Sequence, residues 1–187
     1  MKRIFYILTF LIINIPSYCQ SDFRPGFYIT NQGDTIFGMI DYQGDISNGK
    51  TCHFKKDLNS NTIEFLPGSI LSYRYTDGKY YVSRQLPNDS SKRYVFMEFL
   101  IYGKASVYYH RNAAKEYFFI EKNGEIMEMN NNEVFEYNDV GRKFSKNTNQ
   151  YIGVLKYYFR DAPSMFEEAN NVGFNRASII KISKKYH

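Results

Sequence analysis

The sequence predicts an α+β protein: a predominantly antiparallel β meander, sandwich- or roll-like, followed by a small C-terminal helical segment. Three stretches of alternating residues are each interrupted by a short turn signal, which is the pattern of β-hairpins. The hydrophobic period then changes from that of a strand to that of a helix at about Asn130. Aromatic residues make up 18% of the chain and are all Tyr or Phe. They favour half-buried strands, and an aromatic platform for a ligand is the alternative interpretation.

Residues 1–19 are predicted to be an export signal. Two basic residues precede an apolar run over residues 4–15, which is too short to span a bilayer as a helix. Small residues before Gln20 indicate cleavage there. The alternative is a lipoprotein with lipid on Cys19, although the bulky Tyr18 fits such a site poorly.

Four strands are expected before the clearest hairpin. Gly33 provides the positive φ of a polar connection, and Gly38 marks a bulge or a close backbone approach inside a strand. Residues 45–50 are predicted to be a polar loop. The expected strands cover residues 27–30, 35–42, 51–56 and 62–66.

The clearest hairpin spans residues 69–86, where Asp77-Gly78 interrupts an alternating pattern. A type I′ turn at this pair places Tyr75 opposite Tyr80. One face then carries Leu71, Tyr73, Tyr75, Tyr80 and Val82, with Tyr73 opposite Val82. The other face carries Ser72, Arg74, Thr76, Lys79, Tyr81 and Ser83.

Two more hairpins are predicted downstream. Residues 94–102 and 105–111 flank a turn at Gly103-Lys104 and have apolar residues on both faces, so we expect them in the middle of the sheet. Glu98 is expected to be hydrogen-bonded or at a strand edge, and a functional carboxylate is the alternative. The expected pairs are Leu100–Val107, Phe99–Tyr108 and Glu98–Tyr109, then Ile120–Met127, Phe118–Met129 and Lys122–Glu125 around Asn123-Gly124.

A β domain over residues 20–132 is expected to precede a helical C-terminal segment over residues 133–187. Asp161 is predicted to cap the second of three helices, with Pro163 in its first turn, and Asn175 to cap the third. The apolar stripes are Tyr151, Val154, Leu155 and Tyr158, then Met165, Phe166 and Ala169, then Ile179, Ile180 and Ile182.

The charge balance does not indicate a nucleic-acid partner. The formal charge is +5 and becomes 22 − 19 = +3 once the two basic residues of the export signal are removed. A basic cluster ends the last predicted helix, where cations suit the helix dipole, and binding of an acidic surface is the alternative. Its members are Lys181, Lys184, Lys185 and His187.

No catalytic, cofactor-binding or metal-binding residue is predicted, and no cofactor. We expect no nucleotide hydrolysis of the P-loop kind, and the sequence has no GxGxxG, HExxH, CxxC or GxSxG motif. His53, His110 and His187 lack ligand spacing. Cys52 beside His53 could be read as a nucleophile and its base, but strand neighbours point to opposite faces, so a buried Cys52 is expected. Asp34, in Gly33-Asp34-Thr35, is read as a turn residue. A site assembled only in three dimensions stays open.

A family resemblance rests on residues 23–42 (FRPGFYITNQGDTIFGMIDY), 54–57 (FKKD), 65–70 (FLPGSI), 73–83 (YRYTDGKYYVS) and 155–163 (LKYYFRDAP), with SIIKISKKYH at the end. Together they resemble a β-rich N-terminal periplasmic module of exported and outer-membrane β-barrel proteins from Bacteroidetes. The resemblance covers most of the mature chain, but its motifs carry no catalytic assignment. A barrel commonly follows that module, whereas this sequence stops at His187, so a stand-alone and a truncated member are both open.

The expected function is therefore a binding or assembly module of the cell envelope without catalytic activity, periplasmic or associated with the outer membrane. The alternative is a hydrolase that acts on envelope glycan or peptide through a site not visible as a motif. The expected partner is a protein or an envelope component, with no nucleic acid and no transmembrane helix in the mature chain. An open sheet edge would favour the module, and perturbed acids in a deep pocket would favour the enzyme.

Overall fold

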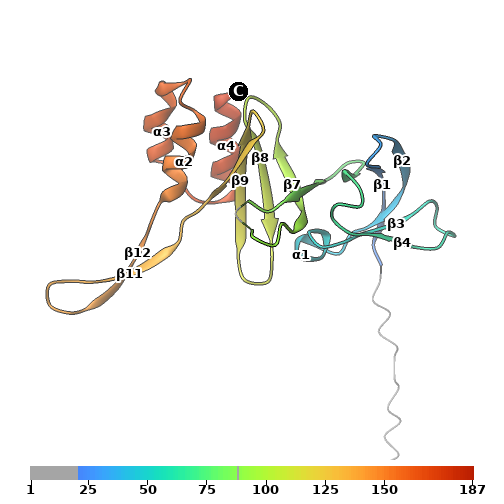
Figure 1. Ribbon diagram of the computed structural model, residues 1–187, viewed down its shortest axis with the longest axis horizontal. Coiled ribbons are helices and arrows are strands. Elements are labelled where there is room, and N and C mark those ends of the chain that lie inside the picture. Colours follow the sequence, from blue (N-terminus) through green and yellow to red (C-terminus); the bar gives the residue numbers. More distant parts are fainter. Residues whose placement is uncertain (1–20, 88) are drawn as a thin grey trace, which may run out of the picture.

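The computed structural model describes residues 21–87 and 89–187 and contains a ten-stranded antiparallel sheet (Figure 1). The strand order is β10-β9-β8-β7-β6-β5-β1-β2-β3-β4, so most strands pair with their neighbours in sequence, while β5 returns to pair with β1. The predicted β-rich α+β class is confirmed. The strands are β1 (Phe23–Ile29), β2 (Thr35–Asp41), β3 (Cys52–Lys55), β4 (Ile63–Phe65), β5 (Ser72–Tyr75), β6 (Tyr80–Gln85), β7 (Tyr94–Ile101), β8 (Ser106–Arg111), β9 (Glu116–Lys122) and β10 (Glu125–Met129).

The second to fourth strands match the predicted ones to within one residue at each end, whereas β1 begins at Phe23, four residues before its predicted start. The predicted export signal lies outside the described residues. Gly26 and Gly38 face each other across β1 and β2. A Cβ on Gly38 would collide with the backbone oxygen of Lys55 and with the ring of Phe54, which confirms the predicted close backbone approach. Residues 45–50 are not simply a loop, because they contain the one-turn helix α1 (Asp45–Asn48).

The central hairpin has a different register from the predicted one. Tyr73 pairs with Tyr81, where Val82 was expected. The connection consists of three residues, 76–78, and Gly78 does not have positive φ, so the predicted type I′ turn is wrong. The hydrophobic pattern could not fix the register, because apolar side chains are buried on both faces of these strands.

This shift of one residue redistributes the tyrosines between the two faces of the sheet. Tyr73 and Tyr81 stack on one face, with ring centroids 4.9 Å apart. Tyr80 and Val82 lie on the opposite face, because successive strand residues alternate. The predicted grouping of Tyr80 and Val82 with Tyr73 is therefore wrong.

The next two hairpins largely follow the predicted registers. The three predicted pairs of β9 and β10 are present, and Asn123 and Gly124 have the positive φ of a type I′ turn (55° and 80°). Between β7 and β8 a bulge places Ile101 opposite Val107, where Leu100 was expected. The extra residue of a bulge has no clear signal in this sequence. The pairs Phe99–Tyr108 and Glu98–Tyr109 are confirmed.

Residues 133–147 form a β-hairpin and not a helix. The strands β11 (Glu133–Tyr137) and β12 (Lys143–Asn147) make a separate two-stranded sheet, and all ten of their residues are exposed. This hairpin, called the arm below, projects away from the rest of the molecule (Figure 1). The helical part of the predicted C-terminal segment therefore begins only at Gln150.

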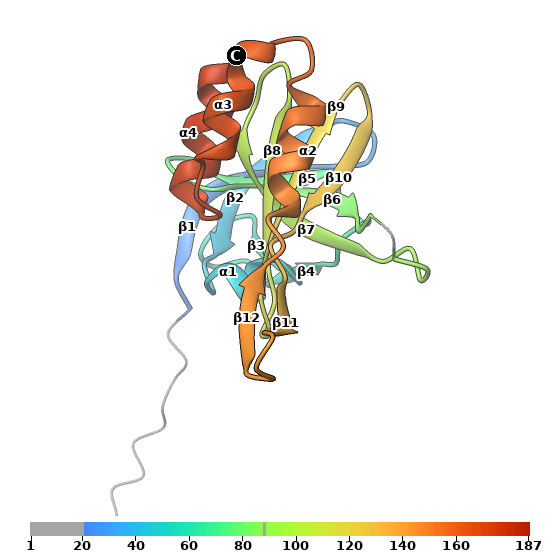
Figure 2. The ribbon, with the colours of Figure 1, turned by 90° about the vertical axis from the view of Figure 1, so that its left-hand side faces the viewer.

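The C-terminal helices group together beside β8 and β9 (Figure 2). In the first predicted stripe Tyr151, Leu155 and Tyr158 are buried and Val154 is half-buried. Asn175 caps the last helix by accepting the N–H of Ser178 at 3.0 Å. Asp161 is not a cap, because its carboxylate instead accepts from Lys122 and Tyr186. The elements are α2 (Gln150–Tyr158), the 3₁₀ turn η1 (Pro163–Met165), α3 (Phe166–Asn170) and α4 (Arg176–Tyr186).

Apolar side chains form three clusters around the sheet. The largest lies between the helices and β7–β10 and includes Leu155, Phe159 and Ile179. A second lies over β1–β3 and β5–β7 and contains Tyr73 and Phe54. A third occupies the opposite face of β6–β9. The first two clusters share one face of the sheet, since Tyr81, Glu98 and Tyr109 are paired neighbours on β6, β7 and β8.

Candidate interaction surface

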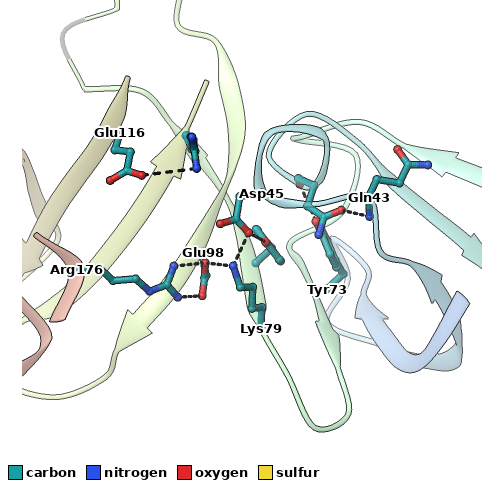
Figure 3. A network of polar contacts seen from close by, with 10 residues as sticks. Gln43, Asp45, Tyr73, Lys79, Glu98, Glu116 and Arg176 are labelled. Carbon is teal, nitrogen blue, oxygen red and sulfur yellow. Dashed lines mark hydrogen bonds and ion pairs between the residues drawn. The ribbon is translucent and has the colours of Figure 1, made fainter. Parts of the chain in front are cut away.

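Glu98 lies where the first two apolar clusters meet, between Tyr81 and Tyr109 of the neighbouring strands. Its side chain is only 5% exposed. Arg176 binds it with two hydrogen bonds, one of them from Nη1 to Oε2 at 2.9 Å. Lys79 places its Nζ 3.1 Å from the same oxygen (Figure 3). This buried carboxylate is thus held by two cations from different parts of the fold.

Asp45 extends this charged cluster to α1. It forms an ion pair with Lys79, and the hydroxyl of Tyr81 donates to its Oδ1 at 3.3 Å. Burial by itself would lower the pKa of Lys79, but the bonds to Asp45 and Glu98 outweigh it and leave that pKa raised. The same balance raises the pKa of Arg176. Lys79 and Arg176 therefore stay charged, and the ion pairs connect α1, the β5–β6 turn, β7 and α4.

A cavity of about 540 Å³ lies beside the cluster, with Glu98, Lys79 and Arg176 in its wall. Both oxygens of Glu98 accept hydrogen bonds from cations, so the carboxylate already has partners within the chain. The prediction of a hydrogen-bonded Glu98 is confirmed, and this geometry is that of a clamp between elements.

Cys52 and His53 lie on opposite sides of β3, as predicted. Cys52 is a free, buried cysteine, and burial raises the pKa of its thiol. His53 instead lies 3.7 Å from Glu64. Burial also lowers the pKa of His110 and of His187, which are in other parts of the chain. Within residues 21–87 and 89–187, no three His, Cys, Asp or Glu side chains gather in a way that could hold a metal ion.

The sequence does contain one P-loop pattern that the prediction overlooked: residues 44–51, GDISNGKT, match GxxxxGK[ST]. In a P-loop the lysine and the Ser or Thr begin a helix whose N-terminus faces the phosphates. Here the single turn of α1 comes before Lys50, and strand β3 begins directly after Thr51. The segment joins the antiparallel strands β2 and β3, so its backbone does not form a phosphate cradle.

Two other charged segments have structural roles. Gly33 has φ 94°, and the N–H of Thr30 donates to the backbone oxygen of Asp34 at 2.9 Å, so Gly33-Asp34-Thr35 is a turn as predicted. In the C-terminal basic cluster, Lys185 forms an ion pair with Glu168. Binding of an acidic surface by that cluster stays untested.

The two edges of the large sheet offer little room for a partner strand. At one edge α2 reaches β10, where the Tyr158 hydroxyl donates to the backbone oxygen of Glu125 at 3.0 Å. The other edge strand, β4, has only three residues and includes the charged Glu64. Short, charged edge strands discourage pairing with other chains. The C-terminal helices thus cover a face and also approach one edge.

The arm exposes several large apolar side chains to water. Five of the thirteen exposed large hydrophobic side chains lie within residues 134–144. The register places Phe135 and Tyr137 on one face of the hairpin and Val134 and Phe144 on the other, so both faces expose apolar side chains that a bound partner could cover. An isolated two-stranded hairpin is also marginally stable in water. The five are Val134, Phe135, Tyr137, Val140 and Phe144.

Comparisons with family models, curated proteins and solved structures found no match for this chain. Every helix among the described residues is too short or too polar to cross a membrane. The charged cluster connects elements of the fold, whereas the arm contributes no residue to any of the three apolar clusters.

Proposed function

We propose that this chain is an exported, non-catalytic module of the cell envelope that works by contact, with the arm as its contact element. The observation that carries the proposal is the exposure of aromatic side chains on a hairpin outside all three apolar clusters. Tyr137 is 70% exposed and Phe135 59% exposed. Leaving such side chains in water forgoes the free energy of burial, which a partner surface would recover.

The base of the arm is held by hydrogen bonds, although its strands lie outside the three apolar clusters. The N–H of Thr148 donates to the backbone oxygen of Asn132 at 2.9 Å, and that of Tyr151 to Asn130 at 2.9 Å. Tyr151 is in turn buried in the helical cluster. A hairpin anchored in this way presents its side chains at a defined position, which favours recognition over a flexible tether.

The test replaces residues 133–147 by Asn-Gly, a two-residue turn that can reconnect the paired Asn132 and Thr148. We expect the denaturation midpoint of the body to stay within error, because the arm contributes nothing to the buried clusters. Binding to native envelope fragments, measured by co-sedimentation, should fall at least tenfold. Equal binding of parent and replacement proteins would refute the arm as the contact element.

Catalysis and export have separate tests. Turnover of an envelope glycan or peptide that one carboxylate or Cys52 substitution abolishes without unfolding would overturn the proposal. Intact mass of the protein from its native envelope should show a chain beginning at Gln20. A chain that still begins at Met1 would refute export, and lipid on Cys19 would support the lipoprotein alternative.

A further inference from the structure

The two strands of the arm carry opposite charges. Glu133 and Glu136 are the charged residues of β11, whereas Lys143 and Lys146 are those of β12. Within the arm they form one loose ion pair, in which Lys146 lies 3.8 Å from Glu136 with both side chains about half exposed. One long edge of the arm is therefore acidic and the other is basic.

Both long edges also have free backbone groups. At the two ends of the arm, Asn138 donates to the backbone oxygen of Arg142 at 3.0 Å and Thr148 to that of Asn132 at 2.9 Å. Because hydrogen-bonded pairs alternate along an antiparallel ladder, the amides of Phe135 on β11 and of Ser145 on β12 point outward. No other described strand pairs with either edge.

We propose that the partner of the arm is the arm of a second copy of this chain, with β12 of one copy pairing antiparallel with β11 of the next. This inference rests on the proposed function, since it names the occupant of the same contact element. The pairing joins a basic edge to an acidic one. A two-fold arrangement would instead place β11 against β11 or β12 against β12, so that all charged residues of the two joined strands would have the same sign.

The geometry allows a specific register. When Ser145 of one copy lies opposite Tyr137 of the next, Lys146 lies opposite Glu136 on the same face of the extended sheet. Two joined arms make a four-stranded sheet, which adds ladder hydrogen bonds to a hairpin that is marginally stable alone. The contact is heterologous, so it leaves a free edge at each end and permits further copies to add.

The test is sedimentation velocity of the purified exported chain over a hundredfold concentration range. The acidic-arm variant carries Lys143→Glu and Lys146→Glu, and the basic-arm variant carries Glu133→Lys and Glu136→Lys. The parent should associate with increasing concentration, less so at 0.5 M salt. Each variant alone should associate about tenfold more weakly or not at all. An equimolar mixture of the two variants should recover association, which also shows that both altered arms can still fold.

A backbone variant tests the strand pairing itself. Ser145→Pro removes an outward amide donor without touching an internal hydrogen bond of the arm, and should weaken association. Ser145→Ala is the matched control and should behave like the parent. A parent that stays monomeric, variants that associate like the parent, or a mixture that fails to associate would each overturn the inference. If arm replacement still abolishes envelope binding in that case, the proposed function stands and only the identity of the partner is wrong.

Discussion

Glu98→Gln should destabilise the protein more than any other single carboxylate-to-amide change in the charged cluster of Figure 3. The substitution keeps the shape of the side chain and removes its charge. Arg176 and Lys79 then face each other across a neutral amide that can accept fewer hydrogen bonds. The free energy of unfolding should fall, because two cations lose the carboxylate that compensates for their partial burial.

The magnitude follows from the exposure of the three partners. Breaking a fully buried ion pair costs about 3–5 kcal/mol, and breaking an exposed one costs about 0–1 kcal/mol. The Glu98 side chain is 5% exposed, but Arg176 is 36% and Lys79 27% exposed, so water can partly solvate the cations. We therefore expect a loss of about 2–3 kcal/mol, which lies between the two limits.

Urea unfolding followed by circular dichroism measures this loss. With a slope of about 2 kcal/mol per molar urea, the midpoint should move down by about 1–1.5 M. Glu116→Gln is the matched control, since Glu116 lies 3.8 Å from Arg111 and both side chains are 49% exposed. That control should change stability by less than about 0.5 kcal/mol.

A second comparison separates the ion pair from local packing. Arg176→Met should cost less in the Glu98→Gln background than in the parent, since the charge it compensates is already gone. The clamp interpretation fails if Glu98→Gln and Glu116→Gln have the same midpoint. It also fails if the effects of Glu98→Gln and Arg176→Met simply add.

Three further predictions concern a turn, a thiol and alkaline pH. Gly124→Val should lower the free energy of unfolding by about 1–2 kcal/mol, since φ at Gly124 is 80°. Gly78→Ala should avoid this conformational penalty, because φ at Gly78 is not positive. Equal losses in urea unfolding would contradict the two turn assignments. Cys52 should react with a thiol reagent at pH 8 only after unfolding, because burial raises its pKa and shields it, and rapid native labelling would contradict this. Burial, aided by Glu121, raises the pKa of Tyr108 to about 12. The folded state thus keeps a proton that the unfolded state releases near pH 10, and stability should fall as pH rises from about 10 to 12, by less in Tyr108→Phe than in the parent.

The sequence alone predicted the structure correctly where a turn, stripe or cap residue determines the conformation of its immediate neighbours. Asn123-Gly124 predicts both the turn and the register of β9 and β10, because φ > 0 at two consecutive positions leaves few alternatives. The helical stripe beginning at Tyr151 and the cap at Asn175 are local in the same sense. Gly38 also indicated a close approach of a neighbouring strand, since glycine is uncommon inside strands unless another chain segment packs closely against it.

Tertiary structure decided the features that depend on distant residues or on water. The register of the central hairpin follows from burial on both faces, which removes the polar alternation that would otherwise select it. Asp161 does not form the predicted helix cap, because its carboxylate binds Lys122, which is 39 residues away in the sequence. Glu98 is similarly matched with Arg176, 78 residues further along the chain. The arm was predicted to be part of the helical segment, and the exposure of its apolar residues is a property of the folded chain alone.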